Sequence, residues 1–268
     1  MGHERVGLLP KTKRWRDIVA LIASSDMSEG DILRIAQQTL NNLRAKLNAF
    51  PYDEGVQAAF KYLTALSVYS RLTDPNVQLA RMGIDLPSDP TPLSFTKAGH
   101  EFVNDNRVSL EYAEIAKKAA GDAIAVWYDK HRARQASLIE MSDSSFDVWH
   151  KASDGSGFCD LSRIFFAKFT ERYLNYFLER EASAVVSSLE EREKFHEGMR
   201  SELERVSQHA FETSKITQSF AAGWFNKNTK NGMPADKSIQ GFLSIAFGKI
   251  SEELRREGKE SWKNSLPS

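Results

Sequence analysis

Cysteine is almost absent from this 268-residue chain, which contains only Cys159. A single thiol excludes an intrachain disulfide and a zinc site built from several cysteines. Because structural disulfides belong to oxidising compartments, the simplest interpretation is a reduced, buried thiol in a cytoplasmic protein. Long hydrophobic runs are missing as well. The longest uncharged, apolar-leaning stretches, 216–226 and 238–248, are shorter than the roughly 20 residues that a membrane span needs.

An excess of charge of either sign is also missing. The 36 lysines and arginines equal the 36 aspartates and glutamates, so a nucleic-acid surface would have to be a local patch. The N-terminal sequence has no apolar stretch typical of a signal peptide, and Val6 breaks the N-myristoylation pattern. We therefore expect a cytoplasmic protein with no membrane partner.

Strand patterns are scarce, because no run of alternating apolar and polar residues is bounded by hairpin turns. Apolar residues instead recur at intervals of three and four along most of the chain, as in 15–23 and 56–67. We predict an all-α, multi-helix globular protein with two helical subdomains and no substantial β-sheet.

Prolines mark the clearest interruption of the helical pattern, with Pro87, Pro90 and Pro92 close together. The predicted division is an N-terminal helical subdomain with a basic leader at 1–83, a proline-rich connector at 84–94, and a larger helical domain at 95–268 that ends in an aromatic helical hairpin. Within the larger domain, 109–140 is expected to be one long helix. Its stripe of small residues would admit a close neighbouring helix, and consists of Ala113, Ala116, Ala120 and Ala123, followed by Trp127.

The segment 210–257 predicts the hairpin itself, because two apolar, small-residue-rich arms flank a polar turn containing Asn231-Gly232. On the first arm, Phe220, Trp224 and Phe225 are expected to pack in the core or to contact a protein partner. The apolar face of the second arm is predicted to include Phe242, Ile245, Phe247, Ile250 and Leu254. Close backbone approach between the arms is expected at Ala221, Ala222, Gly223, Gly241, Ser244 and Gly248.

Catalytic and cofactor motifs are absent: the sequence contains no GxxxxGK[ST], GxGxxG, GxSxG or HExxH. The segment after Asp154 offers oxygens as a calcium loop does, but it lacks the mid-loop glycine and the terminal glutamate. We interpret it as a flexible turn followed by a helix with Asp160 as N-cap. The sequence therefore predicts no catalytic, metal-binding or cofactor-binding residues. An enzyme remains an alternative if separate helices bring together His100, His131, His150, Asp147 and Glu140.

Local basic patches give the only signal that points to a partner. No acidic residue interrupts the N-terminal segment 5–16, where the candidate nucleic-acid contacts are Lys11, Lys13, Arg14, Trp15 and Arg16. The alternative is an exposed leader whose tryptophan anchors the first helix in the core. Lysines also flank the hairpin turn, where they would either meet phosphates or form a polar tip: Lys227, Lys230 and Lys237.

Three hypotheses for the function follow. The preferred one is a non-enzymatic helical interaction or scaffold subunit of a multi-protein complex, with other protein subunits as partners and no cofactor. The alternative is a nucleic-acid-binding accessory subunit of a DNA- or RNA-processing or antiviral defence system. The second alternative is a helical enzyme with an unrecognised site.

Overall fold

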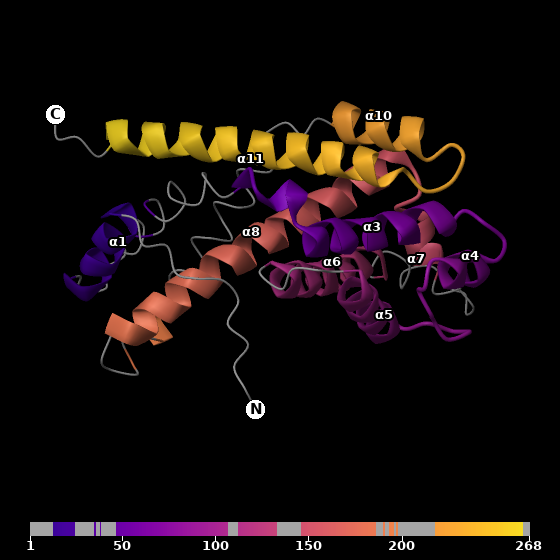
Figure 1. Ribbon diagram of the computed structural model, residues 1–268, viewed down its shortest axis with the longest axis horizontal. Coiled ribbons are helices and arrows are strands. Elements are labelled where there is room, and N and C mark those ends of the chain that lie inside the picture. Colours follow the sequence, from indigo (N-terminus) through magenta and orange to yellow (C-terminus); the bar gives the residue numbers. More distant parts are fainter. Residues whose placement is uncertain are drawn as a thin grey trace. The chain divides into compact units, whose positions relative to one another are not determined.

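The computed structural model describes residues 13–24, 35, 38, 47–106, 112–132, 146–185, 190, 193–195, 197 and 218–264. Across these residues every regular element is a helix and there is no strand (Figure 1). The prediction of an all-α protein without a substantial sheet is therefore confirmed, as the 3.6-residue periodicity indicated. None of the described helices is long and apolar enough to cross a membrane.

The helices follow one another along the chain with the following bounds: α1 Lys13–Ser24, the 3-10 turn η1 Phe50–Tyr52, α3 Glu54–Tyr69, α4 Pro75–Arg81, α5 Pro92–Asp105, α6 Ala113–Arg132, α7 Asp147–His150, α8 Gly155–Val185, α10 Gln218–Asn228 and α11 Asp236–Asn264.

The chain divides into two compact units. Unit 1 comprises Met1–Ala49, Thr170–Lys215 and Ala246–Ser268, and unit 2 comprises Phe50–Phe169 and Ile216–Ile245. In unit 2, helices α3, α5 and α6 pack on one another (Figure 1). Nearly all the contacts described below lie within unit 2.

Helix α3 is buried around most of its circumference. Asp53 caps its N-terminus, because the Asp53 Oδ1 accepts a hydrogen bond of 3.0 Å from the Val56 amide. Two buried hydroxyls are satisfied inside the helix: Thr64 donates to the Phe60 carbonyl at 2.8 Å, and Ser67 donates to the Leu63 carbonyl at 3.0 Å. A helix that is apolar on all sides belongs in a core, and α3 takes that place in unit 2.

The proline-rich segment 84–94 leads into helix α5, whose start is fixed by a capping box between Thr91 and Ser94. Helices α3 and α5, which precede and follow this segment in the chain, contact each other within unit 2, where the Tyr62 hydroxyl of α3 donates to the Phe95 carbonyl of α5 at 2.5 Å. A compact unit is not necessarily a separately folding domain. The division into 1–83, 84–94 and 95–268 therefore stays a prediction.

Helix α6 lies within the long helix predicted for 109–140, of which 109–111 and 133–140 lie outside the described residues. The predicted stripe is buried, as expected, at Ala113, Ala116, Ala120, Ala123 and Trp127. The Trp127 indole also donates a hydrogen bond of 2.9 Å to the Val148 carbonyl, which satisfies its buried N–H group.

The two arms of the predicted hairpin correspond to α10 and α11, while 210–217 lie outside the described residues. The rings of Phe220 and Phe242 stack with centroids 5.3 Å apart, and the Trp224 ring lies 4.6 Å from that of Phe242. Figure 1 shows α10 beside the first turns of α11. The arms therefore bury aromatic surface against each other.

The expected close approach between the arms through their glycines is wrong. In the part of the chain that the structure describes, a β-carbon added at Gly223, Gly241 or Gly248 would meet no atom within 4 Å. The close approach lies instead between α10 and the start of α8, where a β-carbon on Gly155 would lie 2.6 Å from that of Ala222. A glycine inside a helix costs roughly 0.5–1 kcal/mol relative to alanine. Packing among the described residues does not account for the three open glycines.

Candidate functional site

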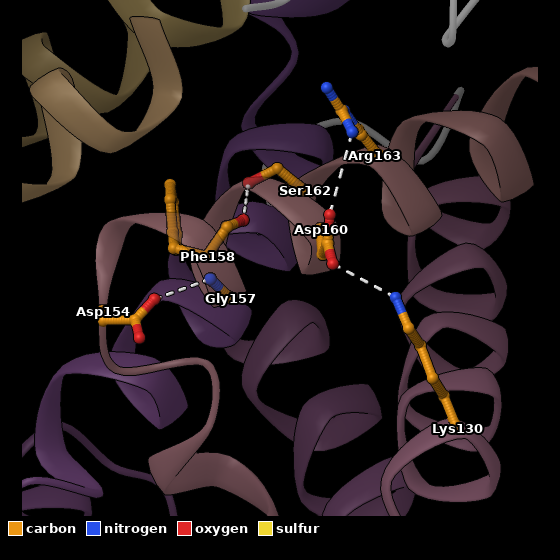
Figure 2. A network of polar contacts seen from close by, with 7 residues as sticks. All are labelled: Lys130, Asp154, Gly157, Phe158, Asp160, Ser162 and Arg163. Carbon is orange, nitrogen blue, oxygen red and sulfur yellow. Dashed lines mark hydrogen bonds and ion pairs between the residues drawn. The ribbon is translucent and has the colours of Figure 1, made fainter. Parts of the chain in front are cut away.

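The oxygen-rich segment before α8 is a helix cap. The Asp154 Oδ1 accepts a hydrogen bond of 2.7 Å from the Gly157 amide, and the helix begins at Gly155 (Figure 2). The predicted N-cap, Asp160, lies inside the helix, so that prediction is wrong. Sequence reasoning assigned the two glycines to a flexible turn, whereas close packing requires them: a β-carbon on Gly157 would overlap the Lys151 carbonyl oxygen.

The Asp160 carboxylate is held by two cations. The Lys130 Nζ lies 3.1 Å from Oδ2, and the Arg163 Nη1 lies 3.7 Å from Oδ1 (Figure 2). These three side chains are each close to 40% exposed, so the ion pairs contribute little to stability. Across the described part of the chain, no three His, Cys, Asp or Glu side chains are grouped to hold a metal ion.

Cys159 is buried in the first turns of α8, with 1% of its surface exposed. Burial raises the pKa of the Cys159 thiol, Arg163 opposes this effect and Asp160 adds to it. A neutral thiol without access to solvent is a poor nucleophile. The structure therefore agrees with the interpretation of Cys159 as a buried thiol.

The histidines that an enzyme hypothesis would combine have different surroundings. On α5, burial lowers the pKa of His100, and the Lys117 charge lowers it further. On α6, the buried His131 ring lies 4.0 Å from that of Trp127. The His150 Nδ1 lies 3.3 Å from the Ser70 carbonyl oxygen. Asp147 is half-buried on α7, and Glu140 lies outside the described residues.

Helix α1 contains part of the predicted basic segment. Arg16 is exposed, whereas Ile18 and Ile22 are buried. The helix therefore has a polar and an apolar face, as the sequence indicated. Lys11 and the side chains of Lys13, Arg14 and Trp15 lie outside the described part of the structure. Nucleic-acid contact through this segment stays a prediction.

The three candidate partner contacts on α10 are not equally accessible. Phe225 is 0% exposed and stacks on Phe158, with ring centroids 4.3 Å apart. Its other neighbour is the Arg71 guanidinium, 4.7 Å from the ring centroid. Phe225 therefore packs in the core of unit 2. Phe220 and Trp224 are half-buried and keep part of their surface exposed, so partner contact through them stays a prediction.

Trp224 also fixes the two helices to each other. Its indole N–H donates to the Ser238 Oγ at 3.1 Å, and the Ser238 hydroxyl donates to the Asn228 Oδ1 at 2.9 Å. This chain of hydrogen bonds links the end of α10 to the first turn of α11.

The exposure of Ile245 on the hairpin differs from the prediction. Ile245, expected on the apolar face of α11, is 46% exposed. A signal was present in the sequence: Ile245 follows Gly241 by four residues and Lys237 by eight, so all three share one helix face. We call Gly223, Gly241 and Ile245 the open strip. We call the exposed residues Lys227, Lys230 and Lys237 the lysine tip.

The sequence matches no known protein family, and no curated protein or solved structure matches it.

Proposed function

We propose that the protein is a non-enzymatic interaction subunit of a multi-protein complex, and that the open strip of the α10–α11 hairpin receives a helix of a partner protein. The observation that carries the proposal is the pair of open glycines beside an exposed isoleucine. Gly223 and Gly241 meet no atom where a β-carbon would stand, and Ile245 is 46% exposed one turn from Gly241.

Packing between helices explains why such residues would be useful. The distance between two helix axes depends on the side chains at the contact, so glycines allow the closest approach. The same glycines destabilise the free helices by roughly 0.5–1 kcal/mol each. A docked helix would offset part of this cost by burying the exposed part of Ile245, which contributes less than the roughly 1.5–3 kcal/mol of a fully buried isoleucine because 46% of the residue is exposed.

The test compares complexes purified with tagged wild-type protein and with two variants of the open strip, Gly241→Leu and Ile245→Asp. Gly241→Leu fills the strip, and Ile245→Asp places a charge on it. Neither change replaces a buried aromatic residue. Partner proteins that remain after nuclease treatment should be lost from both variants, while the melting temperatures stay close to that of the wild type.

Val77→Asp is the matched control, because Val77 is 50% exposed on α4, away from the hairpin residues in sequence. This variant should retain the partners. If the strip variants keep the same partners as the wild type, the hairpin is not the docking surface.

The basic N-terminal segment supports a second candidate, a nucleic-acid-binding accessory subunit of a DNA- or RNA-processing or antiviral defence system. The supporting observation is that Arg16 is exposed on α1, while Ile18 and Ile22 are buried. Changing Lys11, Lys13, Arg14 and Arg16 to Glu should abolish binding to nucleic acid if this segment carries it. Unchanged binding by that variant would exclude the segment.

A further inference from the structure

The α10–α11 hairpin concentrates positive charge at one end. Within 218–245 the basic residues are the three of the lysine tip, and the single acidic residue is Asp236. All three lysines are exposed. The whole chain has equal numbers of basic and acidic residues, 36 of each, so this excess of positive charge is a local feature.

The single carboxylate within 218–245 forms an ion pair with α3. The Asp236 Oδ1 lies 2.7 Å from the Lys61 Nζ of α3. For Lys227, Lys230 and Lys237, the described residues provide neither an ion pair nor a side-chain hydrogen bond. Among the described residues, no carboxylate therefore pairs with the three lysines of the tip, although Asp236 precedes Lys237 in the chain.

A fourth cation stands beside the tip. Arg71, exposed at the end of α3, places its Nη2 3.2 Å from the Thr229 Oγ1 in the turn. The acidic side chain whose charge acts on Arg71 is Asp154, and its carboxylate caps α8. The Arg71 charge therefore adds to the positive end of the hairpin, reduced in part by Asp154.

The lysines project from a backbone that is fixed to unit 2. Thr229 is buried, and its hydroxyl donates to the Phe225 carbonyl at 2.8 Å. The hydrogen bonds through Ser238 hold the start of α11 against the end of α10. A charged ligand would therefore meet ammonium groups on a preorganised turn, which lowers the entropy lost on binding.

The surface around the lysines is polar. The other exposed residues of 226–237 are Asn226, Asn231, Ala235 and Asp236. Protein–protein interfaces have an apolar core and are depleted in lysine. Contacts to a phosphate backbone are instead made by Lys, Asn and other polar groups. This composition favours a nucleic acid over an acidic protein as the ligand.

We propose that the lysine tip binds the phosphodiester backbone of a nucleic acid without reading its sequence. This site is separate from the N-terminal basic segment and goes beyond the docking of a partner helix on the open strip. Each ammonium group acts as a point charge toward phosphate. The free energy of binding therefore comes from released counterions and depends on salt.

The experiment measures fluorescence anisotropy of a labelled 20-base-pair duplex and of a labelled 20-nucleotide oligo-dT, titrated with the full-length protein at several salt concentrations. The triple variant K227Q/K230Q/K237Q replaces each ammonium group by a neutral amide and removes the charges. Three phosphate contacts contribute a slope of about −2.7 to log K against log salt for a duplex. The slope measured for the variant should be shallower than that of the wild type by about 2.7. Between 50 and 200 mM salt, the affinity of the variant should therefore fall by a factor about 40 times smaller than the affinity of the wild type does.

The control variant R81Q/K97Q/K118Q removes the same charge from exposed residues of α4, α5 and α6. It should keep the wild-type slope, and both triple variants should melt near the wild-type temperature. The proposal is overturned if the wild type does not bind at 50 mM salt, or if both triple variants lose the same affinity. Tighter binding of a poly-glutamate peptide than of either oligonucleotide would also overturn it, as would binding abolished by N-terminal changes alone.

Discussion

At the scale of the residue, the glycines divide into those that packing requires and those that it does not. A β-carbon at Gly157 would overlap the Lys151 carbonyl oxygen, whereas a β-carbon at Gly223 would meet nothing within 4 Å. Both residues are helical. They therefore differ in surroundings and not in backbone conformation, which makes them a matched pair for measurement.

The first prediction compares alanine at these two positions. Gly157→Ala should destabilise the protein by about 2–3 kcal/mol, because the backbone around Lys151 must move. Gly223→Ala should stabilise it by up to about 1 kcal/mol, since alanine has the higher helix propensity. Urea denaturation followed by far-UV circular dichroism measures both. Equal denaturation midpoints for the two variants would contradict the packing assigned to Gly157.

His100 supplies the second prediction. Its Nε2 is buried and has no hydrogen-bond partner among the described residues, and burial, followed by the Lys117 charge, lowers its pKa from 6.5. The charges that face it from α6 are those of Glu114, Lys117 and Lys118. The folded protein therefore favours the neutral imidazole, while the unfolded chain takes up the proton more readily.

Stability contributed by His100 should be complete above pH 6.5 and should fall as the pH decreases toward its lowered pKa in the folded protein. Replacing His100 by Gln removes the titrating group, so the variant should lose less stability between neutral and mildly acidic pH than the wild type does. Thermal unfolding over that pH range is the measurement. Parallel curves for the two proteins would show that His100 does not contribute.

Single residues also show where sequence reasoning stops. Asp160 and Asp154 are both reasonable N-caps by residue type, and only the packing of the glycines after Asp154 decides that the helix starts there. Ile245 is apolar and was predicted on the apolar face of α11. It is exposed because it shares a helix face with Lys237. At Trp127, by contrast, the periodicity of the apolar residues was enough to predict burial.

At the scale of the element, the hairpin is held by stacked rings and one chain of hydrogen bonds. Trp224 stacks on Phe158 with centroids 5.7 Å apart, contacts Phe242, and donates to Ser238. Trp224→Ala should destabilise the protein by about 3 kcal/mol, near the lower end for a large aromatic because Trp224 is half-buried.

Trp224→Phe separates the two contributions. It keeps most of the stacked area and loses the hydrogen bond to Ser238, so it should destabilise the protein by about 1 kcal/mol. Calorimetry or urea denaturation distinguishes the two variants. If Trp224→Ala melts like the wild type but loses partner proteins, Trp224 is an interface residue and not part of the core.

Helical periodicity predicted most elements, but it did not predict which faces meet. In α8, Phe165, Phe166 and Phe169 are buried. Their neighbour Phe60 comes from α3, more than a hundred residues earlier in the chain. Apolar contacts are not directional, so the spacing of aromatic residues does not reveal which aromatic face packs against which. The same ambiguity led to the wrong assignment of the glycines to the contact between α10 and α11.

At the scale of the whole molecule, the balance of charge conceals local differences that matter for partners. Equal totals of acidic and basic residues gave no reason to expect a surface for polyanions. The sequence left two alternatives for the lysines beside the hairpin turn, contact with phosphates or a polar tip, and the ion pair between Asp236 and Lys61 favours the first. The spacing of apolar residues predicted the fold class of this chain, whereas its candidate surfaces depend on tertiary contacts.

The single thiol allows the opening of unit 2 to be measured in the intact protein. Cys159 is the only cysteine in the chain, is 1% exposed, and is followed in α8 by the fully buried Phe165 and Phe166. Burial raises its pKa, so the folded state lowers both its access to reagent and its thiolate fraction. A thiol reagent should therefore react only when this part of unit 2 opens.

When opening and closing are fast relative to labelling, the labelling rate reports the free energy of opening. A free energy of about 5.5 kcal/mol corresponds to labelling about 10⁴-fold slower than in the unfolded chain. Gly157→Ala should accelerate native-state labelling by about 30–150-fold, which matches a loss of 2–3 kcal/mol, whereas Gly223→Ala should not accelerate it. Rapid labelling of the wild type under conditions where its helical circular dichroism is intact would show that the start of α8 opens independently of the rest of unit 2.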